Sequence, residues 1–241
     1  LSLYKSGADV IYLNNASYYY HSKILNISES INHFESFKNI TNNIVKNDII
    51  YYEGINEKFD IYLEELSLQR ENFSYIVSSI CSIIKNSDKN LYLSGMGKSG
   101  YICKKSASTW QSLGIKCNYL DLSNLVHGDF GRFKDKDIFI IVSNSGNTQE
   151  VLDVLYHIKL KLKINILILS IVANTTPALE IYSDFTYMLE KIKEADHINM
   201  TPSVSSTVFM TLLDIIGLEL KDNINENEFK LNHPGGELGK K

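Results

Sequence analysis

The chain has 241 residues, of which 44% are hydrophobic and 22% charged, and its formal net charge is −4 at pH 7. These proportions are typical of a globular protein with one main core, and the acidic balance provides no basic surface for a nucleic-acid backbone. The longest apolar run, Ile164 to Ala173, is far shorter than the roughly 20 residues that cross a bilayer. We therefore expect no nucleic-acid partner and no membrane segment.

The cysteines, Cys81, Cys103 and Cys117, are widely spaced and lie in apolar stretches. They form no C-x-x-C pair, so they predict neither a disulfide framework nor a metal site, and they indicate buried thiols in a reducing compartment. We expect a cytoplasmic protein. Because the chain begins at Leu1 rather than Met, a presequence removed from a longer chain stays an alternative.

Residues 1–55 are polar, rich in asparagine and poorly periodic. They are typical of loose helices or an irregular leader, and we assign them to an N-terminal extension without a function. From residue 56 to 86 apolar residues recur at helical spacing, which predicts one or two amphipathic helices. The expected main domain therefore spans residues 56–241.

Beyond these helices, short β-rich runs alternate with helical segments. The predicted strands are Leu91–Ser94, Lys116–Asp121, Ile138–Ser143, Ile164–Ile171 and Phe185–Leu189. The predicted crossover helices are Lys98–Leu113, Gln149–Lys161, Thr176–Tyr182 and Thr201–Leu220. Because parallel strands need such crossovers, the pattern predicts an α/β fold: a doubly wound three-layer sandwich around a five-stranded parallel sheet, preceded by N-terminal helices. Ligands bind such sheets beyond the carboxyl ends of the strands.

A glycine-rich loop follows the first predicted strand. The segment Gly95-Met96-Gly97-Lys98-Ser99-Gly100 has the G-x-G-x-x-G pattern and opens a helix. Glycines let the backbone approach an anion, and a helix N-terminus offers free N–H groups, so Lys98 is a candidate anion partner. With Asp121 about 20 residues later, the pattern is formally a dinucleotide fingerprint. Taken alone, the loop favours phosphate binding of some kind over a nucleotide, and a plain tight turn stays the alternative.

A second polar loop ends the third predicted strand. In the segment Ser143-Asn144-Ser145-Gly146-Asn147-Thr148, hydroxyls and amides surround a glycine directly before a helix. This composition indicates a second anion-binding loop, which a dinucleotide fold does not need at this position. The alternative is an ordinary Ser/Asn helix cap.

Three further segments bring titratable groups to predicted turns. They are Val126-His127-Gly128-Asp129, Lys193-Glu194-Ala195-Asp196-His197 and Asn232-His233-Pro234-Gly235-Gly236. Taken singly, each is better interpreted as a solvated loop or a local cap. The two loops change this interpretation, and we expect all three segments to lie with them at the carboxyl end of the sheet.

The segments GMGKSG, VHGDFG, SNSGNTQE, KEAD and LNHPGGELG, in this order and spacing, resemble the sugar isomerase (SIS) domain family, specifically its arabinose-5-phosphate isomerases. The resemblance covers roughly residues 57–241. It implies a flavodoxin-like sandwich, a sugar-phosphate ligand and no cofactor. It also implies a homo-oligomer, dimer or tetramer, in which one protomer completes its neighbour's pocket.

The resemblance assigns roles to residues. The implied catalytic residues are Lys98, Glu150, Glu194, His233 and His127. The implied substrate- and phosphate-binding residues are Gly97, Ser99, Ser143, Asn144, Ser145, Gly146, Thr148 and Ser205. Moving a carbonyl between C1 and C2 needs a base for a carbon-bound proton and a group that moves the hydroxyl proton as a cis-enediol(ate) forms. We favour a glutamate as the carbon base and His233 as the oxygen-side shuttle, while Lys98 would stabilise an oxyanion or neutralise the phosphate.

The leading hypothesis is therefore an isomerase that interconverts D-arabinose 5-phosphate and D-ribulose 5-phosphate. One alternative is a non-catalytic phosphosugar sensor, against which the intact Glu150, Glu194 and His233 count. The other is an NAD-dependent oxidoreductase, against which the serine-rich second loop counts.

The chain departs from the family pattern in several places. Asn147 stands where relatives commonly have Glu, Asp196-His197 stands where they have Cys-Pro, and the turn Pro202–Ser206 is one residue longer. These changes are candidates for retuned sugar selectivity. Many relatives also continue into regulatory repeats of the cystathionine-β-synthase type, which this chain either lacks or has lost beyond Lys241.

Overall fold

The computed structural model describes residues 2–5, 9–12, 54–174, 177–235 and 237–240. The chain divides into two compact units, Leu1–Glu53 and Gly54–Lys241. In the first unit, β1 (Ser2–Lys5) pairs antiparallel with β2 (Asp9–Tyr12), a hairpin that we did not expect, although Val10, Ile11 and Tyr12 are residue types that favour strands. Residues 13–53 of the predicted extension lie outside the described residues, while Gly54 and Ile55 already belong to the second unit. The extension's role as a separate domain stays a prediction.

The second unit is built on a parallel sheet. Its strands are β3 (Leu91–Gly95), β4 (Cys117–Tyr119), β5 (Ile138–Ser143), β6 (Leu167–Val172) and β7 (Phe185–Met188), arranged in the order β4-β3-β5-β6-β7. All neighbouring pairs are parallel, which confirms the predicted sheet. The strand order reverses between β3 and β5, and a fold of this flavodoxin-like type binds its ligand at that point.

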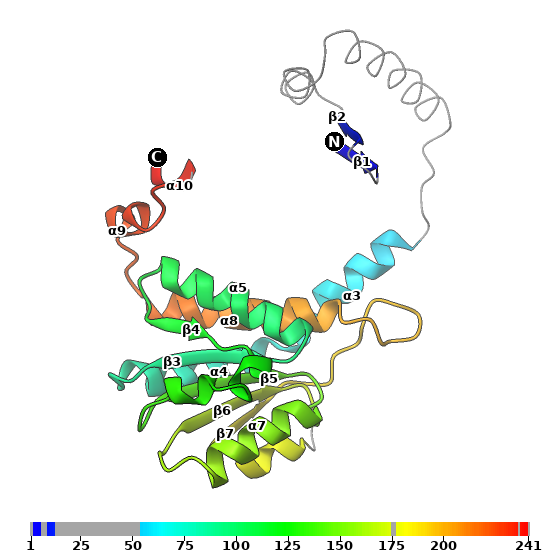
Figure 1. Cartoon of the computed structure of the whole chain (residues 1–241). Coiled ribbons are helices and arrows are strands. Elements are labelled where there is room, and N and C mark those ends of the chain that lie inside the picture. Colours follow the sequence, from blue (N-terminus) through cyan, green and yellow to red (C-terminus); the bar gives the residue numbers. More distant parts are fainter. Residues whose placement is uncertain (1, 6–8, 13–53, 175–176, 236, 241) are drawn as a thin grey trace, which may run out of the picture. The chain divides into compact units, whose positions relative to one another are not determined.

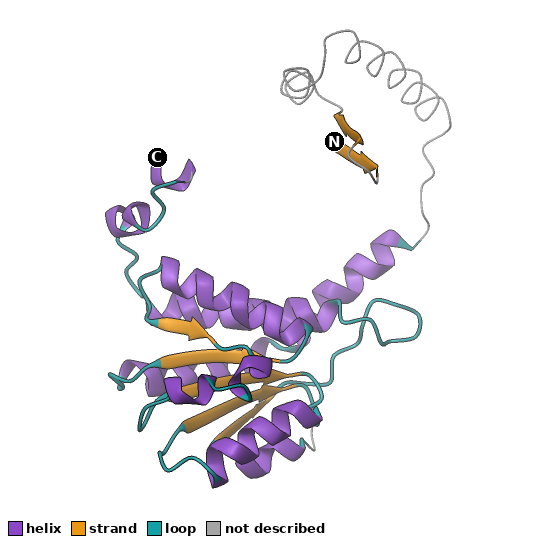
Figure 2. Ribbon diagram, viewed as in Figure 1, coloured by secondary structure: helices purple, strands orange, loops and turns teal. Residues whose placement is uncertain are grey.

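Helices cover both faces of the sheet (Figures 1 and 2). The longer ones are α3 (Ile55–Leu68), α4 (Arg70–Lys85), α5 (Lys98–Ser112), α7 (Gln149–Leu160) and α8 (Val204–Leu220). The shorter ones are α6 (Leu122–Leu125), α9 (Glu226–Leu231), α10 (Glu237–Lys240) and the 3₁₀ helices η1 (Asp129–Arg132) and η2 (Ala178–Tyr182). Within the described residues, no helix is both long and apolar enough to cross a membrane.

The crossover predicted at Thr176–Tyr182 is shorter than expected. Its described part is the 3₁₀ helix η2, which begins after Pro177, while Thr176 lies outside the described residues. The predicted strand from Ile164 begins only at Leu167, and the one from Lys116 is confined to Cys117–Tyr119. The amphipathic stretch before the sheet forms the two helices α3 and α4.

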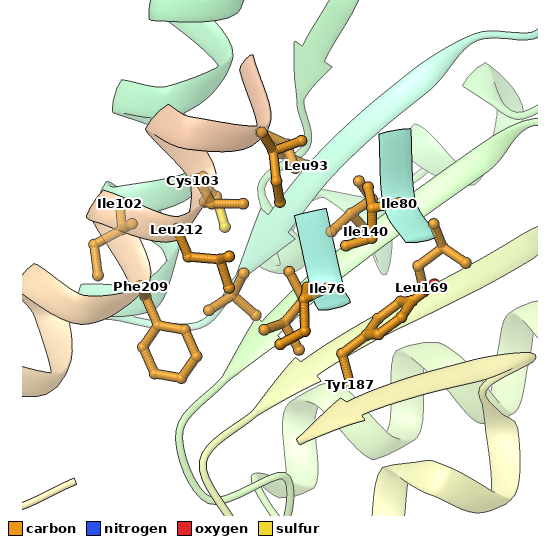
Figure 3. Packing of buried hydrophobic residues seen from close by; sticks show 14 of the residues in the cluster. Ile76, Ile80, Leu93, Ile102, Cys103, Ile140, Leu169, Tyr187, Phe209 and Leu212 are labelled. Carbon is orange, nitrogen blue, oxygen red and sulfur yellow. The ribbon is translucent and has the colours of Figure 1, made fainter. Parts of the chain in front are cut away.

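The larger core lies between the sheet and helices α4, α5 and α8 (Figure 3). Ile76 and Ile80 of α4 lie over Ile140 of β5 and Leu169 of β6, and Leu212 of α8 belongs to the same cluster. A second core lies between the other face and α6, α7 and η2. Strand β5 is buried along its whole length because both cores use it, which explains the uninterrupted apolar run IFIIV before Ser143.

Helices α5 and α8 approach each other closely at a glycine. The indole of Trp110 in α5 is fully buried, and its Nε1–H donates a hydrogen bond of 2.9 Å to the carbonyl oxygen of Leu213 in α8. A Cβ atom at Gly217 would lie 2.4 Å from two atoms of the indole ring. A glycine is therefore required at this position for steric reasons, although glycine is a weak helix former.

Replacing this glycine tests the contact. We expect Gly217→Val to lower the free energy of unfolding by about 2–3 kcal/mol, because the added side chain overpacks the core around Trp110. The matched control is Gly131→Val, since a Cβ at the exposed Gly131 has no neighbour within 4 Å among the described atoms. Urea denaturation followed by fluorescence measures both variants, and an equal loss at the two positions would contradict the proposed contact.

Candidate functional site

A cleft opens where the order of the strands reverses. The parallel register places Gly95 of β3 opposite Val142 of β5, so the loops that follow these strands leave the sheet side by side. Together with the start of α8 they surround a cleft of about 240 Å³. The lining residues are Met96, Gly97, Lys98, Ser99, Ile102, Asn144, Pro202, Ser205, Ser206 and Phe209. The cleft thus includes members of both predicted anion-binding loops.

The loop between β3 and α5 brings a helix N-terminus to the cleft. Gly97 has a φ of 59°, a conformation that favours glycine, and a Cβ at Gly100 would lie 2.6 Å from the carbonyl oxygen of Gly95. These glycines allow α5 to begin directly against the strand. No side chain among the described residues caps α5, so its first N–H groups and the exposed Lys98 border the cleft as potential anion donors.

The loop between β5 and α7 is held by its own hydroxyls. Ser143 Oγ accepts a hydrogen bond of 3.1 Å from the N–H of Gly146, and Ser145 Oγ accepts one of 3.2 Å from the N–H of Asn147. Gly146 has a φ of 65°, and a Cβ there would collide with Pro177. These bonds close turns within the loop and do not cap α7, which has no side-chain cap among the described residues, and each serine keeps its O–H hydrogen as a donor for an anion. Thr148 is the N-cap residue of α7.

Glu194 lies under the start of α8 and is only 6% exposed. Its Oε2 accepts hydrogen bonds from the N–H groups of Ser203 (3.0 Å), Val204 (2.8 Å) and Ser205 (3.2 Å). Oε2 also accepts a bond of 3.1 Å from the Ser203 hydroxyl, and Oε1 accepts one from the Ser205 hydroxyl. The first turn of α8 is therefore capped by a carboxylate from outside the helix, which suits the positive end of the helix dipole.

Glu150 and His127 are more exposed. Glu150 lies in the first turn of α7, two residues beyond Thr148, and no hydrogen bond or ion pair of its side chain occurs within the described part of the chain. His127 follows α6 and is also exposed. Neither residue lines the cleft, so the cleft contains only Lys98 of the five predicted catalytic residues.

We predicted that His233 lies at the carboxyl edge of the sheet, with the two loops. Within a single chain this prediction is wrong. Helix α8 carries the chain back along the sheet, and Asn232 Nδ2 donates a hydrogen bond of 3.1 Å to the carbonyl oxygen of Ser112, the last residue of α5. Lys98 begins that same helix, so its whole length, about 20 Å, separates the two sites. Figure 1 shows α9 and α10 opposite the arrowheads of the strands. His233 itself is half-buried against Phe229.

The sequence and the fold can be compared with known proteins. The SIS domain family matches residues 83–216, more than half of the chain. This chain belongs to the SIS domain family. It is 34% identical over 190 residues to arabinose 5-phosphate isomerase KdsD of Francisella tularensis, which covers 77% of this chain and 57% of that protein. It is 29% identical over 181 residues to arabinose 5-phosphate isomerase KpsF of Escherichia coli, with 74% and 56% covered. The chain thus spans little more than half the length of these relatives.

Solved structures of similar fold include phosphosugar proteins. The structure of E. coli CFT073 c3406 in complex with arabinose 5-phosphate matches this SIS domain with a TM-score of 0.65 and 25% identity, over 77% of this chain and 100% of that one. A putative phosphosugar isomerase involved in capsule formation from Bacteroides fragilis matches with a TM-score of 0.65 and 28% identity, over 76% and 97%. These matches confirm the predicted fold.

Two departures of this SIS domain from its family pattern have structural roles. Asn147 Oδ1 accepts a hydrogen bond of 2.7 Å from the N–H of Ala178, which ties the loop after β5 to the start of η2. Asp196 accepts hydrogen bonds from the N–H groups of Ile198 (3.0 Å), Met200 (3.1 Å) and Thr201 (2.7 Å). Asp196 thus organises the loop between Glu194 and α8, a role that we did not infer from the sequence.

Asp121 also has a structural role. Its Oδ1 accepts hydrogen bonds from the N–H (2.9 Å) and the hydroxyl (2.6 Å) of Ser123, so it caps α6. A dinucleotide site would need this carboxylate for the ribose hydroxyl. The residue that completes the G-x-G-x-x-G pattern thus has a local capping role in this SIS domain, which explains its presence without a dinucleotide.

The Asp196 loop should depend on pH. Burial acts to raise the pKa of Asp196, but hydrogen bonds from the backbone N–H groups of Thr201, Ile198 and Met200 outweigh it and lower the pKa below the ordinary value of 3.8. The stabilisation is therefore complete above pH 3.8 and is lost only as the pH falls through the lower folded-state value. In ¹⁵N NMR spectra, we expect the three amide signals to titrate below pH 3.8. In Asp196→Asn they should not titrate, and amide exchange in the loop should be faster; a midpoint at or above the ordinary value would contradict the assignment.

Proposed function

We propose that this SIS domain is an aldose–ketose isomerase that interconverts D-arabinose 5-phosphate and D-ribulose 5-phosphate. The observation that carries the proposal is the cleft at the switch point, where Lys98 and the start of α5 face the hydroxyl-rich loop after β5. The likeness to relatives named arabinose 5-phosphate isomerases supports the substrate class.

The phosphate binds between the first turns of α5 and α7 in this proposal. Gly97 and Ser99 contribute on the α5 side, and Ser143, Asn144, Ser145, Gly146 and Thr148 contribute on the α7 side. Uncapped N–H groups and hydroxyl donors suit a dianionic phosphate. Ser205 lines the cleft at the start of α8, and its hydroxyl is already bonded to Glu194. We therefore place it beside the sugar and not at the phosphate.

We assign the carbon base to Glu150 in the proposed reaction. Its exposed carboxylate stands in the first turn of α7, next to the proposed phosphate site, and is free to accept a proton. Glu150 removes the proton from C2 of the aldose, the electron pair forms the C1–C2 double bond, and the charge moves to O1. Lys98 stabilises this oxyanion. Transfer of the O2 proton to O1 and return of the carbon proton to C1 then give the ketose.

His233 is the proposed shuttle between the two oxygens, and it has to come from a second copy. Within one chain it lies near the end of α5, far from Lys98. We therefore propose a homo-oligomer, a dimer or tetramer, in which His233 of one protomer completes the cleft of its neighbour. His127 is the other imidazole that the proposal keeps near the site.

Exposed apolar surface supports an oligomer. Ile55, Phe59 and Leu63 follow one another at four-residue spacing along α3 and are each more than half exposed. A groove of about 800 Å³ lies beside this helix, between α4 and α8, and is lined by residues such as Val77 and Ile215. The groove contains none of the predicted site residues, so we interpret it as a surface for packing and not as the active site.

We also propose that the protein works in the cytoplasm. Cys81, Cys103 and Cys117 are free, buried thiols, as predicted. Burial raises the pKa of Cys81 to about 11 and raises the pKa of the other two further, so all three stay protonated. Such thiols suit a reducing compartment.

Hydrogen exchange tests the reaction. In D₂O, wild-type protein should interconvert the two pentose phosphates and place deuterium at C1 of ribulose 5-phosphate and C2 of arabinose 5-phosphate, as read by NMR. Glu150→Gln should lower this exchange by about 10²–10⁴-fold, because it removes the base. Glu180→Gln is the matched control, since Glu180 is an exposed glutamate of η2 outside the cleft. Binding of both sugars without exchange in wild type would instead support the non-catalytic sensor.

Mixing two inactive variants tests the shared site. Lys98→Ala and His233→Ala should each be inactive alone, but a mixed oligomer contains clefts with Lys98 from one chain and His233 from the other. After random exchange of subunits, we expect recovery of about a quarter of the wild-type activity. No recovery, in a sample shown by mass spectrometry to contain mixed oligomers, would mean that both residues act within one chain.

A further inference from the structure

The N-terminus of α8 differs from those of the other two long helices that begin at the carboxyl edge of the sheet. The first turns of α5 and α7 are uncapped by any side chain among the described residues. The first turn of α8 instead gives the N–H groups of Ser203, Val204 and Ser205 to the carboxylate of Glu194. A negative charge of the protein therefore already occupies the site that a substrate anion would use.

One oxygen of the Glu194 carboxylate, Oε2, has no capacity left for another partner. A carboxylate oxygen offers about two acceptor sites, and Oε2 receives four hydrogen bonds from the N–H groups of Ser203, Val204 and Ser205 and from the Ser203 hydroxyl, while Oε1 accepts one from the Ser205 hydroxyl. A protonated carboxyl group is a weaker acceptor, so taking a proton from a substrate carbon would weaken these buried bonds. The residue is also absent from the cleft lining, whereas its partner Ser205 belongs to that lining.

Glu194 connects two parts of the site wall. Its own N–H donates a hydrogen bond of 2.6 Å to Asn199 Oδ1, inside the loop that Asp196 organises. Its carboxylate fixes the first turn of α8, where Ser205 and Ser206 line the cleft. Movement of Glu194 would therefore move this wall of the cleft.

We infer that Glu194 is a positioning residue and not the base: it occupies the N-terminus of α8 and holds the Ser205–Ser206 wall against which the sugar chain is bound. The inference rests on the proposed isomerase function, which it deepens by leaving Glu150 as the carboxylate that takes the carbon proton. It also directs the phosphate to α5 and α7, because the N–H groups of Ser203, Val204 and Ser205 at the start of α8 are already bonded to Glu194.

Steady-state kinetics of Glu194→Gln separates positioning from proton transfer. The amide of Gln keeps one acceptor oxygen but places an NH₂ group against N–H donors, so the first turn of α8 should shift. We expect KM for arabinose 5-phosphate to rise roughly tenfold or more, while kcat stays within about threefold and deuterium still enters at C1 and C2. The opposite pattern, a loss of kcat and of deuterium exchange by about 10²-fold or more at unchanged KM, would overturn the inference.

Glu190→Gln is the matched control. Glu190 is an exposed glutamate four residues before Glu194, and its two described hydrogen bonds join its backbone N–H and carbonyl to the side-chain amide of Gln69. Its replacement makes the same change in charge and should leave KM and kcat at wild-type values. If Glu194→Gln does not fold, Ser203→Ala serves instead. Ser203 does not line the cleft, and its replacement removes one hydroxyl donor to the Glu194 carboxylate. We expect it to raise KM by roughly three- to tenfold at unchanged kcat, and an unchanged KM would count against the inference.

Failure of the proposed function would be recognised separately. If wild type shows no turnover of either pentose phosphate, the isomerase proposal fails, and amide exchange then tests the position of Glu194. Faster exchange of the amides of residues 203–205 in Glu194→Gln than in Glu190→Gln would support the capping role. Equal rates in the two variants would overturn it.

Discussion

The parallel pairing of β3 with β5 is the constraint on which the rest of the site depends. It places Gly95 opposite Val142, and therefore sets the two following loops side by side at one edge of the sheet. The close approach of Gly100 to the Gly95 carbonyl and of Gly146 to Pro177 then fixes where each loop turns. A side chain at either glycine would push its loop outward, so the cleft requires the glycines as much as it requires polar groups.

The carboxyl edge of the sheet has a positive side and a neutralised side. Helices α5, α7 and α8 all begin there, and each brings the positive end of its dipole. Glu194 neutralises α8, while α5 and α7 remain open and Lys98 adds a positive charge beside α5. The proposed sugar phosphate would therefore place its phosphate on the side of α5 and α7 and its uncharged sugar chain towards the neutralised side. The same asymmetry distinguishes the two glutamates, because only Glu150 is left with a carboxylate free of hydrogen bonds in the described structure.

Much of this was predictable from the sequence, for identifiable physical reasons. Strand β5 was predictable because it is buried on both faces and begins with an unbroken apolar run, and the two loops at the cleft were predictable because glycines and hydroxyls cluster after β3 and β5. The role of Glu194 could not be found in this way, since its partners lie nine to eleven residues further along the chain and belong mostly to the backbone. The Asp196 loop had a local signal, a short acidic side chain before polar turn residues, which we interpreted only as a difference from the family.

The length of α8 explains why the order of the motifs along the chain wrongly placed His233 at the carboxyl edge of the sheet. A helix of 17 residues spans about 25 Å, enough to return the chain from the carboxyl edge to the opposite edge of the sheet. The hydrogen bond from Asn232 to Ser112 and the ion pair of Lys221 with Glu228 then hold α9 to that end of its own chain. Moving α9 and His233 to Lys98 would break both contacts, and the described structure shows no contacts that would replace them. The proposed catalysis by His233 is therefore compatible with the fold only if a second copy brings the opposite edge of its own sheet to the cleft.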